Sequence, residues 1–310
     1  MCLCSCFEKE IQALCELCVF AVIDWYLSDI SVCEKKMPPE AWLNKLRDHF
    51  AHYKGAIIAY SGGVDSALLA YVAHLTLKNK MLAALADSPS LARREYQHAL
   101  AFAEKHHIPL QIIDTQEMKN PFYEANQGDR CYHCKKALFE RIEEMRQEPG
   151  NSFSNLSWPV FYGVNLDDLG DYRPGIQAAN EAAILAPYVE LKMDKNTIRG
   201  VCAFLGLDVA EKPAMPCLAS RIAYGQEVNV EKLKQVEAAE DFLSDLGFQM
   251  LRVRHHGDTA RIELLPADFN LALQHRKIIS EKLHELGFLY VALDIDGFKS
   301  GSLNAALNKT

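Results

Sequence analysis

The residues 56–66, AIIAYSGGVDS, limit what this chain can fold into more than any other stretch. Ala56 to Tyr60 form a continuous apolar run with the length of a buried strand. A Ser-Gly-Gly turn follows, and a helical pattern begins at Ser66. A strand, a glycine turn and a helix start commonly bind phosphate, because glycines let the backbone approach an anion and the first-turn N–H groups point at it. The stretch therefore predicts an α/β fold with a phosphorylated ligand.

The polar residues of this turn have separate expected roles. Ser61 and Ser66 offer hydroxyl donors, and Asp65 brings a carboxylate, which favours a Mg²⁺ ion between it and the phosphate. The chain contains neither the Walker A pattern nor G-x-G-x-x-G. Instead, Ser61–Ser66 resembles the PP-loop of ATP pyrophosphatases, which cleave ATP between its α- and β-phosphates. The alternative is an ordinary Gly-Gly turn.

Strands and helices alternate after this turn. Apolar runs at 81–86, 110–113 and 160–162 are typical of further buried strands, and residues 185–188 favour another short extended piece. The alternation predicts a doubly wound parallel sheet over residues 37–227, whose ligands bind at the carboxyl ends of the strands. Asp87 and Ser88 lie at one such end, where they either reach a nucleoside or form the polar start of a helix.

A second strand end is rich in acids. The residues concerned are Asn165, Asp167, Asp168 and Asp171, which follow the predicted strand at 160–162. Acidic side chains at this edge of a sheet suit Mg²⁺ or a polar ligand, whereas Asp-rich loops elsewhere often cap helices. The position at a strand end leads us to expect a ligand role.

Residues 120–130 have a loop-like composition, and two cysteines three residues apart, Cys131 and Cys134, then begin a predicted helix. On one side of a first helical turn, their sulfurs would bind one metal ion or cluster. The helix N-terminus and the neighbouring Arg130 and Lys135 should lower the pKa of both thiols. His133 points away from the pair, and we assign it no role.

A third cysteine, Cys217, follows a segment that contains Pro213 and Pro216. The prolines stiffen the backbone, and together with the nearby Arg221 they favour a working cysteine over a buried structural thiol. Cys202 lies among apolar residues of a predicted helix, and we expect it to be a buried apolar side chain.

Residues 228–310 follow a different pattern. A helix at 230–246, strands at 250–255 and 259–264, a helix within 266–286 and a strand at 289–293 predict a small α+β domain. Arg252 and Arg254 alternate along one strand, and Arg261 lies on the next. They either face solvent, as on a half-exposed strand, or grip a phosphate together.

Composition narrows the class of protein. The 310 residues are enough for two domains, and the net charge of −8 implies no broad basic surface for nucleic acid. No apolar run is long enough to span a membrane, and no secretory signal is recognisable. We therefore expect a cytoplasmic protein whose cysteines are thiols, metal ligands or catalysts.

Residues 1–36 form an atypical extension that contains six of the ten cysteines. Cys15 and Cys18 form a C-x-x-C pair that would suit a metal ion. We favour two simpler interpretations, which are a loosely packed additional helix or an extension before a start at Met37.

Several motifs that follow one another along the chain give a more specific resemblance than the PP-loop alone. The segments 61–66, 131–135, 165–175, 217–225, 252–257 and 287–304 are similar to those of the LarE family. These enzymes are the PP-loop sulfur transferases of nickel-pincer nucleotide biosynthesis. The resemblance extends from about Met37 to Asn304. It implies an adenine nucleotide alpha hydrolase-like domain and a C-terminal domain for substrate binding and oligomerisation.

The resemblance also implies a reaction. ATP adenylates the carboxylates of pyridinium-3,5-biscarboxylic acid mononucleotide with release of PPi, and sulfur then displaces AMP to leave thiocarboxylates. Ser61 and Asp65 would act in catalysis. The ligands of ATP and PPi would be Ser61, Gly62, Gly63, Val64, Asp65, Ser66, Asp87, Ser88, Asp168 and Arg221. The substrate would be held by Arg252 and Arg254, with Asp268 and either Glu237 or Glu240.

The sulfur source divides the family. Members with one cysteine, equivalent to Cys217, sacrifice its sulfur and retain dehydroalanine, whereas members with three bind a 4Fe–4S cluster with one open iron. Cys131, Cys134 and Cys217 match the second group. The implied cofactors are therefore ATP, Mg²⁺ and the cluster, and Cys217 is expected to be catalytic. A separate sulfur donor and a homo-oligomer, such as a hexamer, are the implied partners.

Three other functions compete with this one. A tRNA thiolase also combines a PP-loop with three cysteines, but the net charge of −8 disfavours a nucleic-acid substrate. An amide ligase like NAD synthetase would not need the cysteines. A non-catalytic nucleotide- or metal-binding regulator would explain neither Asp65 nor the acidic loop. We expect no membrane partner.

Overall fold

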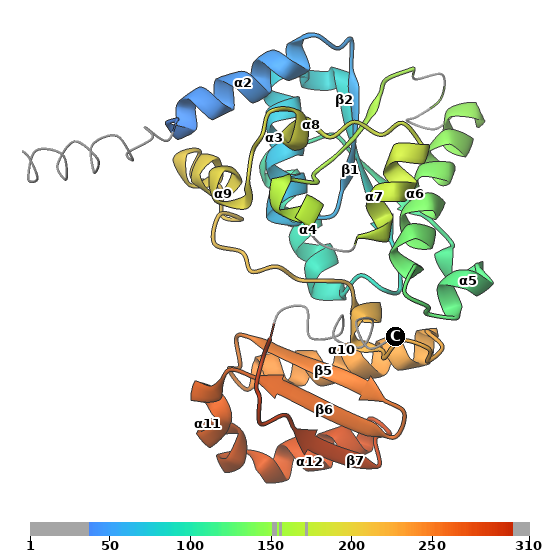
Figure 1. The fold of residues 1–310 in the computed structure, drawn as a ribbon, viewed down its shortest axis with the longest axis vertical. Coiled ribbons are helices and arrows are strands. Elements are labelled where there is room, and N and C mark those ends of the chain that lie inside the picture. Colours follow the sequence, from blue (N-terminus) through green and yellow to red (C-terminus); the bar gives the residue numbers. More distant parts are fainter. Residues whose placement is uncertain (1–36, 151–153, 155–156, 171–172, 300–310) are drawn as a thin grey trace, which may run out of the picture.

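The computed structural model describes residues 37–150, 154, 157–170 and 173–299 (Figure 1). The cysteine-rich extension 1–36, with Cys15 and Cys18, lies outside the described residues, as does Asp171. Two separate sheets form the framework of the described part.

The first sheet has four parallel strands within the described ranges, in the order β3-β2-β1-β4. They are β1 (Ala56–Tyr60), β2 (Met81–Asp87), β3 (Leu110–Asp114) and β4 (Val160–Tyr162). Since β2 and β3 lie on one side of β1 and β4 on the other, the chain changes its direction of winding beside β1. This confirms the predicted doubly wound sheet and puts its ligand-binding switch point at the end of β1.

Helices cover both faces of this sheet (Figure 1). They are α2 (Pro39–Ala51), α3 (Val64–Leu77), α4 (Arg93–Lys105), α5 (Pro121–Glu124), α6 (Arg130–Gln147), α7 (Pro174–Glu181), α8 (Pro187–Glu190) and α9 (Lys195–Phe204). Ile58 of β1 packs in the core that includes α2, α3, α4 and α9, whereas Ile57 packs in the core that includes α6 and α7. Successive residues of this strand therefore bury on opposite faces.

Two segments differ from the sequence expectation. Residues 120–130, expected to be a loop, contain α5 and the start of α6, because Asn120 caps α5 and Pro121 opens it. Leu185 pairs with Phe161 only as an isolated bridge, and α8 follows where the sequence favours an extended piece.

The second sheet has the order β5-β6-β7. It consists of β5 (Leu251–His256), β6 (Thr259–Leu264) and β7 (Tyr290–Leu293), together with α10 (Val230–Asp245), α11 (Phe269–Gln274) and α12 (Arg276–Glu285). The first two strands are antiparallel around a tight turn at Gly257, where φ is 64°, and β7 runs parallel to β6. The domain boundary at residue 228 stays a prediction, although the two sheets lie on either side of it.

The arginines of β5 do not face solvent. Arg252 and Arg254 are 5% and 6% exposed, because the short helix η4 (Leu218–Arg221) packs against β5. Ile222, directly after η4, also pairs with His255. The interpretation of β5 as a half-exposed strand is therefore wrong. In the part of the chain that the structure describes, no helix has the length and apolar character needed to cross a membrane.

Candidate active site

The turn 61–66 lies at the carboxyl end of β1 and opens α3. Gly63 is extended and caps the helix, while Gly62 has a φ of 71°, in the left-handed region that favours glycine. The Ser61 amide donates to the Ser66 hydroxyl at 3.1 Å, and that hydroxyl donates to the Gly63 carbonyl at 3.2 Å. The N-terminus of α3 therefore lies directly at the loop, as an anion site requires.

Two glycines permit close packing around this loop. A Cβ on Gly62 would lie 2.5 Å from the Cβ of Ala99 in α4. A Cβ on Gly163, directly after β4, would lie 3.0 Å from backbone atoms of Asp65 and Ser66. The loop is therefore held between α4 and the end of β4.

Asp65 is held from three directions at the switch point. Its Oδ1 accepts from the Asn165 side chain at 3.2 Å, and its Oδ2 pairs with the Lys195 ammonium. The Tyr188 hydroxyl donates to its carbonyl oxygen at 2.8 Å. Asn165 follows β4, so residues from two neighbouring strand ends meet here. Sequence reasoning missed Lys195, because nothing in its helix-start context points to a partner 130 positions away.

The acidic loop after β4 has two local functions. Asp168 accepts from the Asn165 backbone amide at 3.1 Å and pairs with Arg173 at 2.8 Å. Asp167 accepts from the backbone amide of Lys195 at 2.8 Å, at the first residue of α9. Asp167 therefore fits the helix-capping alternative, and the contact of Asp168 with ATP stays a prediction.

Asp87 and Ser88, at the end of β2, both have partners. Asp87 pairs with Arg93 at 2.7 Å. The Ser88 hydroxyl donates to the buried carboxylate of Glu117, which also accepts from Thr115. Their contact with a nucleoside stays a prediction.

Cys131 and Cys134 lie in the first turn of α6, and Cys217 immediately precedes η4. Burial raises the pKa of Cys134 to about 12, and loss of solvation also raises the pKa of Cys131. The predicted lowering of both pKa values is wrong, because desolvation outweighs the positive charges of Arg130 and Lys135. The charge of Cys217 further raises both pKa values, and Cys134 packs against the apolar cluster that contains Leu218, the neighbour of Cys217 in the chain.

A buried clamp joins these two segments. Arg130 donates to the Ala219 carbonyl at 2.8 Å and to the side-chain oxygen of Asn126. The side-chain nitrogen of Asn126 then donates to three backbone carbonyls, at 3.3, 2.8 and 3.0 Å, which belong to Ile222, Ala223 and Gln226. Asn126 is fully buried with a φ of 51°, which asparagine tolerates better than most residues. From the sequence, Arg130 is expected only to lower the pKa values of the cysteines and Asn126 has no assigned role, so the clamp is not predicted.

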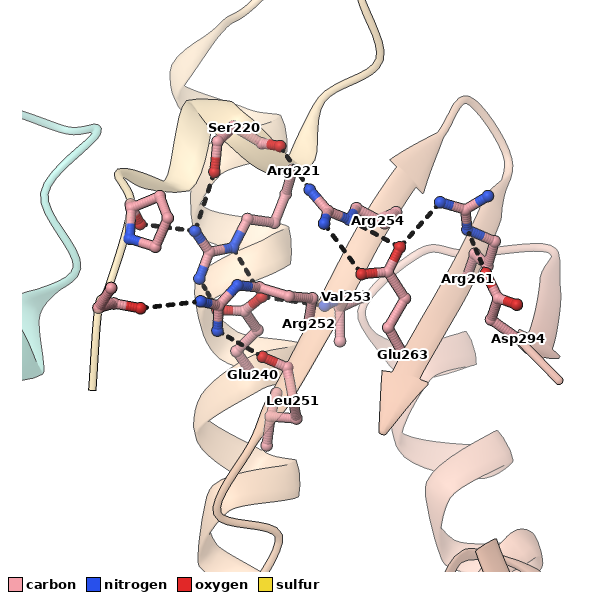
Figure 2. A network of polar contacts seen from close by, with 12 residues as sticks. Ser220, Arg221, Glu240, Leu251, Arg252, Val253, Arg254, Arg261, Glu263 and Asp294 are labelled. Carbon is pink, nitrogen blue, oxygen red and sulfur yellow. Dashed lines mark hydrogen bonds and ion pairs between the residues drawn. The ribbon is translucent and has the colours of Figure 1, made fainter. Parts of the chain in front are cut away.

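A second polar network lies between η4 and the C-terminal sheet, as Figure 2 shows. Arg221 is buried and forms a bidentate ion pair with Glu240 of α10, with both bonds at 2.9 Å. Its Nη1 donates to the carbonyls of Pro216 at 2.6 Å and Cys217 at 3.1 Å. Arg221 thus holds the segment that carries Cys217, and its contact with ATP stays a prediction.

Arg254 is paired in the same way. It forms a bidentate ion pair with Glu263 at 3.0 and 2.9 Å and donates to the Ser220 carbonyl at 2.8 Å. Arg261 pairs with the same Glu263 at 2.9 Å and with Asp294 at 3.5 Å (Figure 2). Carboxylates therefore balance both of these arginines.

Arg252 lacks such a partner. It donates to the carbonyls of Leu251 at 2.7 Å and Ala214 at 3.2 Å, and its guanidinium lies 4.9 Å from the ring centre of Phe298. No ion pair joins it to a carboxylate of the described residues. Burial and then the charge of Arg221 lower its pKa to about 10. A buried guanidinium in this state suits an anionic ligand.

The acids predicted beside these arginines lie in different places. Glu240 belongs to the network, whereas Glu237 accepts from the backbone amide of Arg93 in α4. Asp268 lies, half-buried, in the short helix η5 (Pro266–Asp268). Contacts of Glu237 and Asp268 with a substrate stay predictions.

Comparison with known proteins identifies the family. A pyridinium-3,5-bisthiocarboxylic acid mononucleotide synthase of Lactiplantibacillus plantarum is 33% identical over 253 residues, or 81% of this chain and 90% of the relative. The chain belongs to the LarE family. An uncharacterized protein of Synechocystis sp. is 43% identical over 272 residues, or 87% of this chain and 99% of the relative.

Two more distant similarities accompany this relationship. The NAD synthase family matches residues 40–145, which contain β1 to β3 and the turn 61–66. One of the subunits of the glutamine-hydrolyzing GMP synthase of Thermoplasma volcanium is 28% identical over 65% of this chain and 68% of the relative. Membership of the LarE family and this PP-loop make the protein an ATP-dependent enzyme.

The three thiols suit the cluster expected for three-cysteine members of the LarE family. Within the described ranges, no three His, Cys, Asp or Glu side chains are grouped to hold a single metal ion. A cluster is wider than one ion and binds thiolates spread around it. Cys131, Cys134 and Cys217 are free thiols, and Cys134 packs against the apolar cluster that contains Leu218, directly after Cys217. Their number and chemistry therefore fit a 4Fe–4S cluster with one open iron.

The donor set at the switch point also fits Mg²⁺. Asp65 and Asp168 supply carboxylate oxygens, and Asn165 links the two through its side chain and backbone amide. Such oxygens are the ligands that Mg²⁺ prefers. The ion pair between Asp65 and Lys195 must open before Asp65 binds a metal ion.

Proposed function

We propose that this protein is an ATP-dependent sulfur transferase that converts the carboxylates of pyridinium-3,5-biscarboxylic acid mononucleotide into thiocarboxylates for the nickel-pincer cofactor. Three free thiols carry the proposal: Cys131 and Cys134 lie on one segment of this PP-loop chain and Cys217 on another, and the hydrogen bond from Arg130 to the Ala219 carbonyl joins the two segments. The relative from Lactiplantibacillus plantarum supports it, because its name is that of a synthase of the bisthiocarboxylic acid mononucleotide.

The first step would activate the substrate. A carboxylate oxygen would attack the α-phosphorus of ATP, forming an acyl adenylate and releasing PPi. The backbone of 61–66 and the N-terminus of α3 would stabilise the charge that develops on PPi. Ser61 and Ser66 would donate hydroxyl hydrogen bonds, and Asp87 and Ser88 would lie toward the nucleoside. Mg²⁺ held by Asp65 and Asp168 would add positive charge.

The second step would exchange oxygen for sulfur. Sulfide would attack the acyl carbon, and AMP would leave with the oxygen that the carboxylate gave up, so that the step needs no oxidant or reductant. A 4Fe–4S cluster held by Cys131, Cys134 and Cys217 would supply a sulfur atom at its open iron. The clamp of Arg130 and Asn126 would keep the three thiols together.

The substrate phosphate would bind at the arginine network. Arg252 is a buried cation with no carboxylate partner among the described residues, and Arg254 lies beside it. A phosphate there would form charge-assisted hydrogen bonds, which are stronger than neutral ones. Asp268 and Glu237 stay in the proposal as further substrate contacts.

The similarity to NAD synthase and GMP synthase favours one second candidate, an amide-forming ligase that makes an adenylate. Such an enzyme would leave the three thiols without a chemical role. The three free thiols, on two segments that Arg130 joins, therefore favour sulfur transfer over amide formation.

A single experiment separates the two candidates. Anaerobically purified protein is given ATP, Mg²⁺ and the pyridinium biscarboxylate nucleotide, and PPi release and product mass are measured. We expect nucleotide-dependent PPi release and a product in which sulfur has replaced oxygen. PPi release that requires ammonia or glutamine and yields an amide would contradict the proposal.

The sulfur source needs a separate measurement. Iron analysis and absorbance of the anaerobic protein should reveal the cluster, and intact-mass analysis should leave Cys217 unchanged after turnover. An iron-free, active protein whose Cys217 loses one sulfur atom would refute the cluster. Light scattering on the same sample tests the proposed homo-oligomer.

A further inference from the structure

The segment between α9 and η4 connects the two parts of the proposed reaction. Figure 1 shows it running from α9 toward the C-terminal sheet. It carries Lys212 near the PP-loop and Cys217 at its far end. Residues 213–217 are exposed, so their position depends on a few anchoring contacts. Lys212 has no role in the reaction described so far.

Lys212 joins this segment to the PP-loop. Its ammonium donates to the Gly62 carbonyl at 3.1 Å and pairs with Glu95 of α4 at 2.8 Å. The two side chains are only 15% and 14% exposed. Water therefore competes only weakly with this ion pair. The pair keeps its geometry better than an exposed ion pair would. One side chain thus links three elements, which are the loop, α4 and the cysteine segment.

The backbone of the segment is anchored on both sides of its prolines. Arg199 of α9 donates to the Lys212 carbonyl at 2.6 Å. Arg252 donates to the Ala214 carbonyl at 3.2 Å, and Arg221 holds the carbonyls of Pro216 and Cys217. The chain from Lys212 to Cys217 spans at most roughly 18 Å when fully extended. A displacement of Lys212 should therefore also displace Cys217, because the short segment between them cannot compensate for much movement.

We propose that Lys212 is a positioning residue that sets the distance between the adenylate formed at the PP-loop and the sulfur delivered at Cys217. This inference rests on the proposed function, because it concerns the coupling of its two steps. When the segment is displaced, water attacks the waiting adenylate instead of sulfur, and the products are AMP and the original carboxylate. PPi is then released without formation of a thiocarboxylate.

The test is the ratio of PPi released to thiocarboxylate formed, measured on anaerobically purified full-length protein with ATP and the pyridinium biscarboxylate nucleotide. Lys212→Met should raise this ratio roughly tenfold or more, because small misplacements of reacting groups cost large factors in rate. The rate of PPi release itself should stay close to that of the wild type. Lys212→Arg keeps the charge and a donor, and it should restore most of the coupling.

Lys105→Met is the matched control. Lys105 also joins α4 to a carboxylate, that of Asp208, at 2.9 Å, but the two side chains are 57% and 56% exposed. It does not contact the PP-loop in any described interaction, and its replacement should leave the ratio unchanged. Should Lys212→Met not fold, Glu95→Gln decides the question, since it removes the anchor on α4 and should also raise the ratio.

Two results would overturn the inference. One is a wild-type ratio of PPi to thiocarboxylate in folded Lys212→Met. If Lys212→Met does not fold, the same result in Glu95→Gln overturns the inference. The other is a loss of PPi release at an unchanged ratio, because Lys212 would then act on ATP itself. A wild-type enzyme that forms no thiocarboxylate would contradict the proposed function instead, so the two failures are distinguishable.

Discussion

Replacement of Arg252 by methionine should make the unliganded protein more stable while it weakens substrate binding. Burial lowers the pKa of Arg252 to about 10, so the guanidinium stays protonated at neutral pH at a cost of roughly 3 kcal/mol in folding free energy. Methionine removes this cost but loses the hydrogen bonds to the Leu251 and Ala214 carbonyls, worth about 1 kcal/mol each. We therefore expect a net stabilisation of about 1 kcal/mol.

The pH dependence of this effect has a definite sign. The pKa of Arg252 is lower in the folded protein than in the unfolded chain, so the cost is present below pH 10. It shrinks as the pH rises above about 10, where the folded guanidinium begins to lose its proton, and it is gone only above the ordinary pKa of 12.5. The stability advantage of Arg252→Met should therefore shrink in alkaline solution. Urea denaturation at neutral and alkaline pH measures both values.

Arg252→Met should weaken the binding of the substrate, although it stabilises the unliganded protein. Removal of a buried charge that pairs with a ligand costs about 2–5 kcal/mol, which is roughly a 30- to 4000-fold increase in Kd. Calorimetric titration with the pyridinium biscarboxylate nucleotide should detect this loss, while the Kd of ATP stays unchanged. Arg261→Met is the control, because that arginine is 35% exposed and has two carboxylate partners.

Two results would refute this reasoning. A variant that is destabilised by more than about 1 kcal/mol would assign Arg252 a structural role. Unchanged affinity for the nucleotide would remove Arg252 from the phosphate site, whatever its effect on stability.

Two further predictions test the loop and the clamp. Asp65→Asn removes the charge that pairs with Lys195 and is proposed to hold Mg²⁺, so PPi release should fall roughly 100-fold or more; normal PPi release would exclude that role. Asn126→Ala leaves three carbonyls without their donor and puts alanine at a φ of 51°, so urea denaturation should record a loss of roughly 3 kcal/mol. Asn126→Gly relieves only the backbone strain and should recover a minor part, whereas full recovery would mean that the hydrogen bonds contribute little.

Local sequence patterns predict the framework of this protein well. Each apolar run, such as Ala56–Tyr60, is bounded by turn residues, and its period and length decide between strand and helix within a few positions. The prediction of a loop at 120–130 is wrong for a local reason. Asn120 followed by Pro121 is a helix-start signal, which is hard to recognise within a stretch of loop-like composition.

The candidate site is only partly predictable, because its contacts join distant positions. The turn 61–66 and the three cysteines carry their chemistry in their own residue types. Lys195, by contrast, becomes a site residue only because the loop after β1 and the start of α9 meet in the folded chain. The expected lowering of the pKa values of Cys131 and Cys134 is wrong for a related reason, since a sequence shows nearby charges but not the loss of solvation that outweighs them.

Because Gly62 packs against Ala99, one face of α4 determines the position of the PP-loop relative to the sheet. Ala99 touches the loop with a single methyl group and occupies the room that any side chain on Gly62 would need. A larger residue at position 99 would lift the loop from outside the site and tilt the N-terminus of α3 away from its anion. Substitutions on this face of α4 would therefore impair the use of ATP, although the substituted residues bind no nucleotide.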